Sequence, residues 1–453
     1  MKRRGDELYE AIRSRENVEC ALYNAARGVR RRPAVQKCLD NAGDVVSDIC
    51  RMLERGDFRT GTYRPRTIFE PKLRHIHILP FFPDRIVQHA LVDVVAPAVW
   101  EPSFIFDSYA CRKGKGQTRG VLRTAQFVRR HAFDFGYDIR SFYHSIDHGV
   151  LKSLIERRIK GARTLGLCFD IIDSWQDAPG RGCPIGNLTS QWFGNVYMNA
   201  LDHYAKEELG IKAYVRYCDD FHVFGDDRSE MRWFDTCIAA FVRDELHLDF
   251  SKRNLARTKD GCDFLGYRIF PEKILVRKST AKRIRRRMDG LRRILDRDAR
   301  LDEARLLSMM GSVASAGGVL KHAQSHNLAV AMKLEELQIG LVERYKAVRR
   351  TGNPGNPGGR EDKDAGGAEQ EDCDDADGAA HLASREPGRH VFAVRDGAVL
   401  LRRGRDEASA RAFHSVPQHT LAARQPEHGV PVRRDDQDDG QVVLSNVTEK
   451  EAA

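Results

Sequence analysis

The spacing of hydrophobic residues divides the chain into stretches with a helical period and stretches with a strand period. Apolar residues that recur every three to four positions predict amphipathic helices. Runs of β-branched and aromatic residues bounded by turn-forming residues predict strands instead. The first pattern predicts helices over residues 7–56, 85–96, 121–130, 148–159, 229–250 and from 279 to about 350, and the stretch 181–204 is expected to begin as a Gly-Pro loop and become a helix. The second predicts a strand at 133–139 and hairpins at 213–225 and 261–270, which together make an α+β protein.

The hairpin predicted at Ala213–Gly225, with the sequence AYVRYCDDFHVFG, carries two adjacent carboxylates at its tip. Apolar runs enter and leave Asp219 and Asp220, so the pair is expected to form the turn. Two neighbouring carboxylates repel each other unless a cation lies beside them. Mg²⁺ is the natural candidate, because it takes oxygen ligands and often needs one or two protein carboxylates together with substrate phosphates. A solvated Asp-Asp turn is the simpler alternative for this stretch taken alone.

A third carboxylate lies near the end of the strand predicted at 133–139. Asp138 is placed at that end, and Asp147 follows after a turn. Asp147 directly precedes an amphipathic helix, where its carboxylate can accept the unpaired N–H groups of the first helical turn. We therefore assign Asp147 a structural role and Asp138 a chemical one, although the sequence also permits the reverse.

Basic residues are concentrated in two further stretches. The loop FDSYACRKGKGQTRG, residues 106–120, interleaves basic residues with glycines, which let a backbone approach a phosphate closely. The helix expected from Ser279 carries an apolar stripe and an almost single-signed run of arginines. With a formal net charge of +10, these stretches indicate a polyanionic partner, a nucleic-acid backbone above all. A merely basic surface is the alternative.

The totals bound the class of protein. A chain of 453 residues is long enough for two or three domains. Its ten cysteines form no CxxC pair, so we expect reduced thiols in a cytoplasmic protein. The basic N-terminus lacks an apolar run, and no run of about eighteen apolar residues follows, so neither a signal peptide nor a membrane helix is expected.

The composition changes after residue 350. A Gly/Pro linker is followed by the strongly acidic stretch 361–377 and then by a remainder with few bulky apolar residues. Such a composition predicts a largely disordered tail. The stretch HVFAVRDGAVLLRR within it is expected to form an isolated hairpin.

In their order along the chain, these features resemble the palm of a reverse transcriptase. The resemblance covers residues 7–345 and is carried by RKGKG, DIRSFYHSID, YCDD, the basic residues after LHLDF, FLGYRIF and the basic helix that follows. It implies a right-hand polymerase fold. The expected parts are an N-terminal helical region at 1–60, fingers and palm with an antiparallel sheet plus helices at 61–275, a helical thumb at 276–350, and the largely disordered tail at 351–453.

Among reverse transcriptases, the chain most resembles those of bacterial diversity-generating retroelements. The stretch IGNLTSQ carries this likeness, since most reverse transcriptases have Gln at the position of Ile185 and Pro at that of Gln191. The stretches RIVQHAL, FIFDSYACRKGKG and VLKHAQSHNL support it. Cys218 in the YCDD motif is less usual than Ala, Val or Met, and the tail matches nothing in the family.

The resemblance also implies the site residues and partners of an RNA-directed DNA polymerase. Asp138 and Asp219 would bridge two Mg²⁺ ions, with Mn²⁺ as an alternative, while Asp220 assists and Ile139 completes the metal site. Tyr143 would be the bulky gate against a ribose 2′-hydroxyl. The other nucleotide-binding candidates are Arg112, Lys113, Gly186, Gln191 and Lys252. The nucleic-acid-binding candidates are Lys115, Leu265, Gly266, Tyr267, Arg283, Arg286 and Arg287. The implied partners are an RNA template, a DNA or RNA primer, dNTPs and a small basic accessory protein.

Other functions compete with this interpretation. A catalytically idle RNA-binding scaffold could share the fold, although the presence of all three carboxylates argues against it. Within the enzyme class, a phage-defence reverse transcriptase and a group II intron maturase are the alternatives. The sequence shows no endonuclease or His/Cys-rich appendage, which weakens the maturase option.

Overall fold

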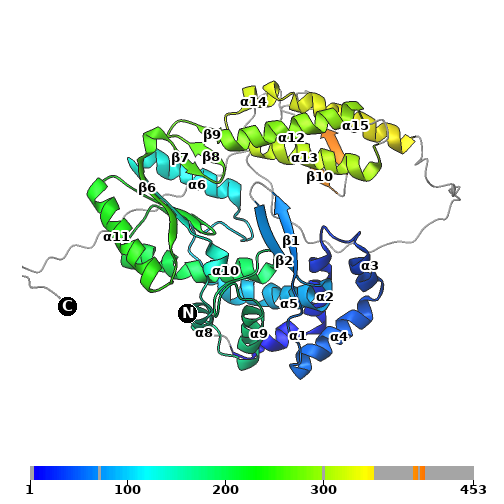
Figure 1. The fold of residues 1–453 in the computed structure, drawn as a ribbon, viewed down its shortest axis with the longest axis vertical. Helices are drawn as coiled ribbons and strands as arrows, with labels where there is room; N and C mark the ends of the chain where they lie inside the picture. Colours follow the sequence, from blue (N-terminus) through cyan, green and yellow to red (C-terminus); the bar gives the residue numbers. More distant parts are fainter. Residues whose placement is uncertain (1–4, 70–72, 298–300, 351–390, 396–397, 403–453) are drawn as a thin grey trace, which may run out of the picture. The chain divides into compact units, whose positions relative to one another are not determined.

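The computed structural model describes residues 5–69, 73–297 and 301–350, and two strands nearer the C-terminus (Figure 1). The chain divides into two units, Met1–Glu361 and Asp362–Ala453. In the second unit, β10 (Val391–Arg395) and β11 (Ala398–Arg402) pair antiparallel, which confirms the hairpin predicted there. The rest of the tail, for which disorder is predicted, lies outside the described residues.

Four helices begin the first unit, as the helical period predicts. Asn17 ties the second of them to a later helix, because its amide donates to the carbonyl of Ala90 at 3.0 Å. The last of the four ends where Gly56 adopts a positive φ of 70°, a conformation that glycine takes at little cost. The bounds are α1 (Glu7–Arg13), α2 (Arg15–Ala26), α3 (Pro33–Asp40) and α4 (Ala42–Arg55).

The middle of the chain begins with one hairpin, and helices follow it. The hairpin consists of β1 (Arg64–Phe69) and β2 (Leu73–Ile78), paired antiparallel. α9 is buried along one face and was not predicted from the sequence. The helices are α5 (Ile86–Val95), α6 (Gln117–Arg130), α7 (Phe142–Ser145), α8 (His148–Glu156), α9 (Ala162–Asp173), α10 (Leu188–His203) and α11 (Arg228–Asp244).

A four-stranded antiparallel sheet with the order β4-β5-β3-β6 lies between two hydrophobic cores. Side chains alternate between the faces of a strand. Phe135 and Phe221 therefore enter the large core that α10 and α11 share. Val215 and Phe224 enter a second core, which contains residues of α6 and of the next sheet. The strands are β3 (Phe133–Ile139), β4 (Tyr214–Tyr217), β5 (Asp220–Gly225) and β6 (Phe250–Arg257).

A three-stranded sheet and four helices complete the first unit. The sheet has the order β7-β8-β9, and its first hairpin confirms the one predicted at 261–270. The helices share a third core of their own and lie side by side in Figure 1. The bounds are β7 (Cys262–Phe264), β8 (Tyr267–Ile269), β9 (Ile274–Val276), α12 (Lys278–Arg297), α13 (Glu303–Lys321), α14 (His326–Ala331) and α15 (Leu334–Arg350).

Three predicted boundaries differ from the structure. The turn of the central hairpin lies at Cys218 and Asp219, one residue before the predicted pair, and Asp220 begins β5. α6 begins at Gln117 rather than at residue 121. α11 ends at Asp244 rather than at residue 250, because His247 adopts a positive φ of 48° that a helix cannot continue.

Candidate active site

Three carboxylates lie together where β3 and β4 end and β5 begins. Asp138 and Asp220 are direct cross-strand partners on β3 and β5. Asp219 precedes Asp220 in the β4–β5 turn, which Cys218 makes tight by adopting a φ of 62°. The structure thus brings Asp138 together with the Asp pair, although the two stretches are far apart in sequence.

The environment of Asp219 favours a cation beside it. Burial raises the pKa of its carboxyl group to about 6, and the negative charges of Asp138 and Asp220 add to the increase. The positive charge of Arg74, on β2, acts in the opposite direction. Carboxylates that repel one another in a half-buried site are typical ligands for a divalent metal. Arg74 was not among the site residues predicted from the sequence. The basic residues of the short β1–β2 hairpin were the only pattern that could have indicated it.

The three carboxylates offer oxygen ligands only, which is the ligand type that Mg²⁺ takes. Among the described residues, their ligand atoms do not all lie within 4.8 Å of one another. Ile139 has a buried apolar side chain, which leaves its main-chain carbonyl as the group that it can offer.

Neighbouring residues on β6 surround Asp138. The Ser251 hydroxyl donates to the Asp138 carboxylate. Lys252 is the ladder partner of Asp138 across the β3–β6 pair and is exposed. The other candidate of this region, Asp147, caps α8 by accepting from the N–H groups of Gly149 and Val150 at 2.9 and 3.2 Å. The structural role predicted for Asp147 is confirmed.

A buried ion pair holds the hairpin that carries Asp219. Arg216 and Asp202 both have fully buried side chains, and Nε of the arginine donates to Oδ1 of the aspartate at 2.7 Å. A further N–H of Arg216 donates to the Cys218 carbonyl at 2.9 Å, within the turn that carries Asp219. Burial alone would lower the pKa of Arg216, but the charge of Asp202 outweighs it and raises that pKa. This pair was not predicted from the sequence. A charged residue inside the apolar strand YVRYC was the pattern that indicates a buried partner.

The nucleotide-binding candidates Tyr143, Gly186 and Gln191 lie on three different elements. The Tyr143 hydroxyl is 3.2 Å from Cys218 Sγ, and the Asp219 charge contributes to its raised pKa after burial and Cys218. Gln191 accepts from the Cys111 thiol at 3.4 Å. Gly186 has a φ of 112° and packs beside β2. Tyr143 therefore lies close to Asp219, while Gly186 lies in the loop before α10 and Gln191 lies on α10 itself, in contact with the basic loop.

Two basic side chains of the loop 106–120 bind groups within the protein. Arg112 is only 7% exposed, and its Nε donates to Glu101 Oε1 at 2.9 Å. Lys115 donates to the Phe106 carbonyl at 2.7 Å. Lys113 is exposed. Arg112 thus stabilises the loop in this structure, which leaves Lys113 as the loop residue best placed to meet a phosphate.

The nucleic-acid-binding candidates divide into buried and exposed residues. Leu265 and Gly266 form the β7–β8 turn with positive φ values of 50° and 85°. Tyr267 is buried, and its hydroxyl donates to the Val319 carbonyl at 3.0 Å, so it fastens this sheet to α13. Arg283 and Arg286 are exposed on α12. Arg287 is exposed as well and donates to Ser312 on α13 at 2.9 Å.

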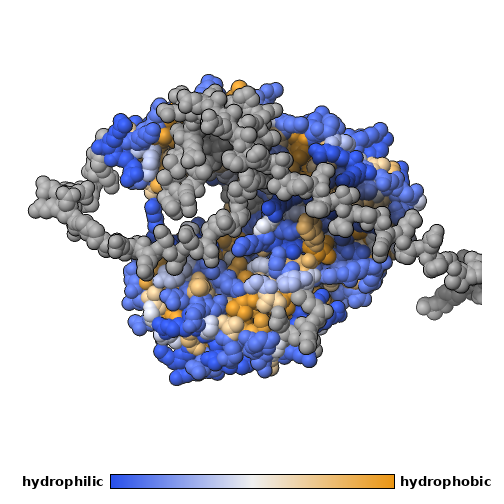
Figure 2. All heavy atoms as spheres, turned by 180° about the vertical axis from the view of Figure 1, so that it is seen from behind, coloured by the Kyte–Doolittle hydropathy of each residue, from blue (hydrophilic) through white to orange (hydrophobic). Residues whose placement is uncertain are grey.

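Figure 2 shows hydrophilic residues over much of the face turned away in Figure 1, with hydrophobic residues at several places between them. Within the described residues, no helix combines the length and the apolar character that a membrane span requires.

Comparisons with known proteins give distant matches. No protein-family model matches the chain. Protein YkfC of Escherichia coli (strain K12) is 26% identical over 271 residues, covering 48% of this chain and 70% of that protein. A telomerase structure from Candida albicans, in complex with a fragment of telomeric RNA, matches with 13% identity and a TM-score of 0.38, over 64% of this chain and 59% of that one. Apo telomerase from Candida tropicalis matches with 10% identity and a TM-score of 0.37, over 68% of each chain.

Proposed function

We propose that this chain is an RNA-directed DNA polymerase, which makes cDNA from an RNA template. The observation that carries the proposal is the gathering of three carboxylates at one end of an antiparallel sheet. Asp138 and Asp220 are cross-strand partners, and the charges of both raise the pKa of Asp219. Nucleotidyl transfer needs such a cluster, because its catalysis rests on positioning and on neutralising charge.

In this proposal, Asp138 and Asp219 hold both metal ions, Asp220 assists, and Ile139 contributes its carbonyl. When bound, two Mg²⁺ ions lower the pKa of a primer 3′-hydroxyl and stabilise the leaving pyrophosphate. Arg74 on β2, whose charge already acts on Asp219, and the exposed Lys113 supply positive charge for the triphosphate.

Selection of the sugar would fall to Tyr143. Its ring lies beside the carboxylates, and its hydroxyl contacts Cys218 in the turn that positions Asp219. A bulky side chain held at this place meets a ribose 2′-hydroxyl and leaves room for deoxyribose. Phe142, the neighbouring aromatic residue, is buried in the main core and is the weaker candidate.

The arrangement of the described elements supports a right-hand layout. We assign 1–60 to the N-terminal helices, 61–275 to fingers and palm, and 276–350 to the thumb. The exposed arginines of α12, Arg283 and Arg286, would hold the nucleic-acid backbone, and the Leu265–Gly266 turn would contact the primer. Lys115 and Arg287 are bonded within the protein and would act by shaping these surfaces.

We further place the enzyme in a diversity-generating retroelement, with dNTPs as substrates and a small basic accessory protein as partner. The support is the stretch Ile185–Gln191, with Ile and Gln at positions where most reverse transcriptases have Gln and Pro. In the structure, the Ile185 carbonyl accepts from the His77 N–H on β2 at 3.0 Å, so this loop is fixed against the first hairpin. Sequencing of cDNA made by the purified enzyme with the accessory protein tests the setting. Errors concentrated at template adenines would support the retroelement setting. Equal error rates at all four template bases would contradict that setting without contradicting the proposed polymerase activity.

The polymerase itself is tested by primer extension on an RNA template with Asp219→Asn. Loss of one metal ligand should reduce extension by at least about a hundredfold, since each tenfold costs only about 1.4 kcal/mol of transition-state stabilisation. RNA binding should persist, because the basic surfaces are unchanged. Asp244→Asn is the matched control, as this carboxylate lies exposed on α11 and pairs with Arg243. A wild-type protein that binds RNA and extends no primer would identify the idle scaffold instead.

A further inference from the structure

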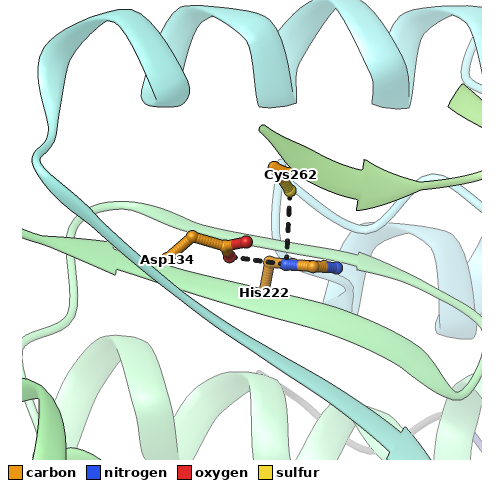
Figure 3. A group of neighbouring side chains, drawn as sticks. All are labelled: Asp134, His222 and Cys262. Carbon is orange, nitrogen blue, oxygen red and sulfur yellow. Dashed lines mark hydrogen bonds and ion pairs between the residues drawn. The ribbon is translucent and has the colours of Figure 1, made fainter. Parts of the chain in front are cut away.

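Three polar side chains are buried together between the four-stranded and the three-stranded sheets (Figure 3). Asp134 comes from β3, His222 from β5 and Cys262 from β7. Their exposed fractions are 5%, 2% and 1%, respectively. Each offers one ligand atom, and these atoms all lie within 4.8 Å of one another. None of the three has a place in the polymerase mechanism proposed above.

The imidazole ring is the centre of this cluster. His222 Nδ1 is 2.6 Å from Asp134 Oδ1 and 3.6 Å from Cys262 Sγ, so the carboxylate and the thiol approach the same ring nitrogen. The opposite nitrogen, Nε2, is 3.6 Å from Asp220 Oδ1. Gly136 on β3 leaves the space for the ring, because a Cβ there would come within 2.7 Å of His222 Cε1.

The combination of donors indicates a particular class of cation. A carboxylate oxygen, an imidazole nitrogen and a cysteine sulfur together suit Zn²⁺, which accepts all three, and do not suit Mg²⁺, which prefers oxygen alone. A zinc ion about 2.0 to 2.3 Å from each atom leaves ligand atoms roughly 3.3 to 3.8 Å apart. The Nδ1–Sγ distance of 3.6 Å already meets this requirement. The Nδ1–Oδ1 distance of 2.6 Å is that of a hydrogen bond, and it must lengthen by less than about 1 Å to admit the ion.

The burial of the cluster gives a cation a structural role. Charged groups withdrawn from water are unfavourable unless they are paired or bind a metal. Asp134 and His222 are paired across 2.6 Å, and a cation would replace the proton in this bond. Burial raises the pKa of the Cys262 thiol to about 12, so the sulfur is neutral until a cation replaces its proton. Since Cys262 belongs to the three-stranded sheet and the other two residues belong to the four-stranded sheet, one ion would join the two sheets.

We propose that Asp134, His222 and Cys262 form a structural zinc site that fastens β7 to β3 and β5. The three side chains supply one oxygen, one nitrogen and one sulfur, and the second Asp134 oxygen or a water takes the fourth position of a tetrahedral ion. The site is distinct from the carboxylates of Asp138 and Asp219. It stands independently of the polymerase activity, because its metal, its ligands and its role all differ.

Metal binding by the full-length protein tests the proposal. The protein is stripped with a chelator and titrated with Co²⁺, which substitutes for Zn²⁺ and reports a bound thiolate through a ligand-to-metal absorption band in the near ultraviolet. In the wild type the band should saturate with one thiolate-bound ion per chain, whatever the carboxylate site binds, and Zn²⁺ should abolish the band and raise the melting temperature. Cys262→Ser should lose the band and bind Zn²⁺ at least about 100-fold more weakly.

Cys168→Ser is the matched control, because Cys168 is equally buried but lies on α9, away from the cluster. This variant should keep the band and the stabilisation by Zn²⁺. If Cys262→Ser fails to fold, zinc X-ray absorption of the wild type decides, with one sulfur neighbour expected at about 2.3 Å. A zinc shell of nitrogen and oxygen alone, or a Co²⁺ band unchanged in folded Cys262→Ser, would overturn the site. Primer extension is measured separately, so that a failure of either proposal is recognised on its own.

Discussion

Asp219 is a carboxyl group placed where its negative charge is unfavourable. It is half-buried in a turn, and Asp138 and Asp220 lie close enough to raise its pKa together with burial. Perturbed carboxyl groups of this kind mark functional sites more often than solvated turns do. The sequence alone identified all three carboxylates, because YCDD and a strand ending in Asp are local patterns. It could not identify the effect of the Arg74 charge on Asp219, because β2 and the β4–β5 turn come near each other only in the folded chain.

The raised pKa of Asp219 predicts a dependence of stability on pH. Without divalent ions, the folded state binds the Asp219 proton more tightly than the unfolded state does. This contribution is therefore fully present below pH 3.8 and is lost as the pH rises to about 6. The loss is at most about 3 kcal/mol. We expect Asp219→Asn to be more stable than the wild type at pH 7.5 in EDTA and similar to it near pH 3.5, as measured by urea unfolding.

Asp244→Asn controls for the loss of any carboxylate. Because the bond from Arg243 lowers the pKa of this exposed group, its removal should slightly lower stability at pH 7.5 relative to pH 3.5, which is opposite in sign to the effect of Asp219→Asn. Addition of Mg²⁺ at pH 7.5 should narrow the gap between the wild type and Asp219→Asn, since the ions neutralise the repulsion. An Asp219→Asn protein that loses stability over the same pH range as the wild type would contradict the assigned electrostatics.

Tyr143 allows a prediction about sugar selection. Tyr143→Ala removes the bulk beside Asp219 and should raise the ratio of ribonucleotide to deoxyribonucleotide incorporation by about tenfold or more, an effect of roughly 1.4 kcal/mol. Tyr143→Phe is the matched control, because it keeps the ring and loses only the hydroxyl contact with Cys218. The ratio is measured by primer extension with each nucleotide type. If Tyr143→Ala leaves the ratio unchanged, the gate lies elsewhere.

At the scale of elements, the hairpin of β4 and β5 depends on an interaction that the sequence does not reveal. The alternating apolar residues predict its two strands, since such residues fit a half-buried sheet. Its turn lies one residue earlier than predicted because Cys218 adopts a left-handed conformation, which a residue other than glycine takes up only when its surroundings hold it. One contact that holds it is the bond from Arg216 to the Cys218 carbonyl. The partner of Arg216, Asp202, lies on α10, so the arginine in an apolar strand signals a buried partner without identifying it.

The buried pair predicts a large loss of stability on single substitution. Arg216→Met leaves Asp202 buried without its partner, and we expect the free energy of unfolding to fall by about 3 to 5 kcal/mol. Urea unfolding measures the change. Arg243→Met breaks the exposed pair with Asp244 and should alter stability by less than about 0.5 kcal/mol. Equal effects of the two substitutions would show that Arg216 does not hold the hairpin.

At the scale of the whole chain, the sequence predicted the order of helices and strands better than their ends. The N-terminal helices, the strand with Asp138 and the helices up to Arg350 agree with the structure, because each has a sustained period. α9 escaped prediction, although Thr164, Leu167, Cys168 and Ile171 follow a helical period. The zinc-type cluster escaped as well, since Asp134, His222 and Cys262 become neighbours only when two sheets pack together.

The positions of the three hydrophobic cores along the chain predict how much residues 351–453 contribute to stability. Every described member of the three hydrophobic cores lies between Leu8 and Val348. A protein truncated after Arg350 retains all of them, while the deleted segment is rich in charge and glycine. We therefore expect the truncated protein to keep a cooperative thermal transition within about 2 °C of the full chain and to keep primer extension. Truncation after Gly290 is the contrasting control, because it removes Leu306 and Leu341 from the third core and should abolish the cooperative transition. Aggregation of the longer truncation, or loss of its transition, would show that residues beyond 350 stabilise the body of the protein.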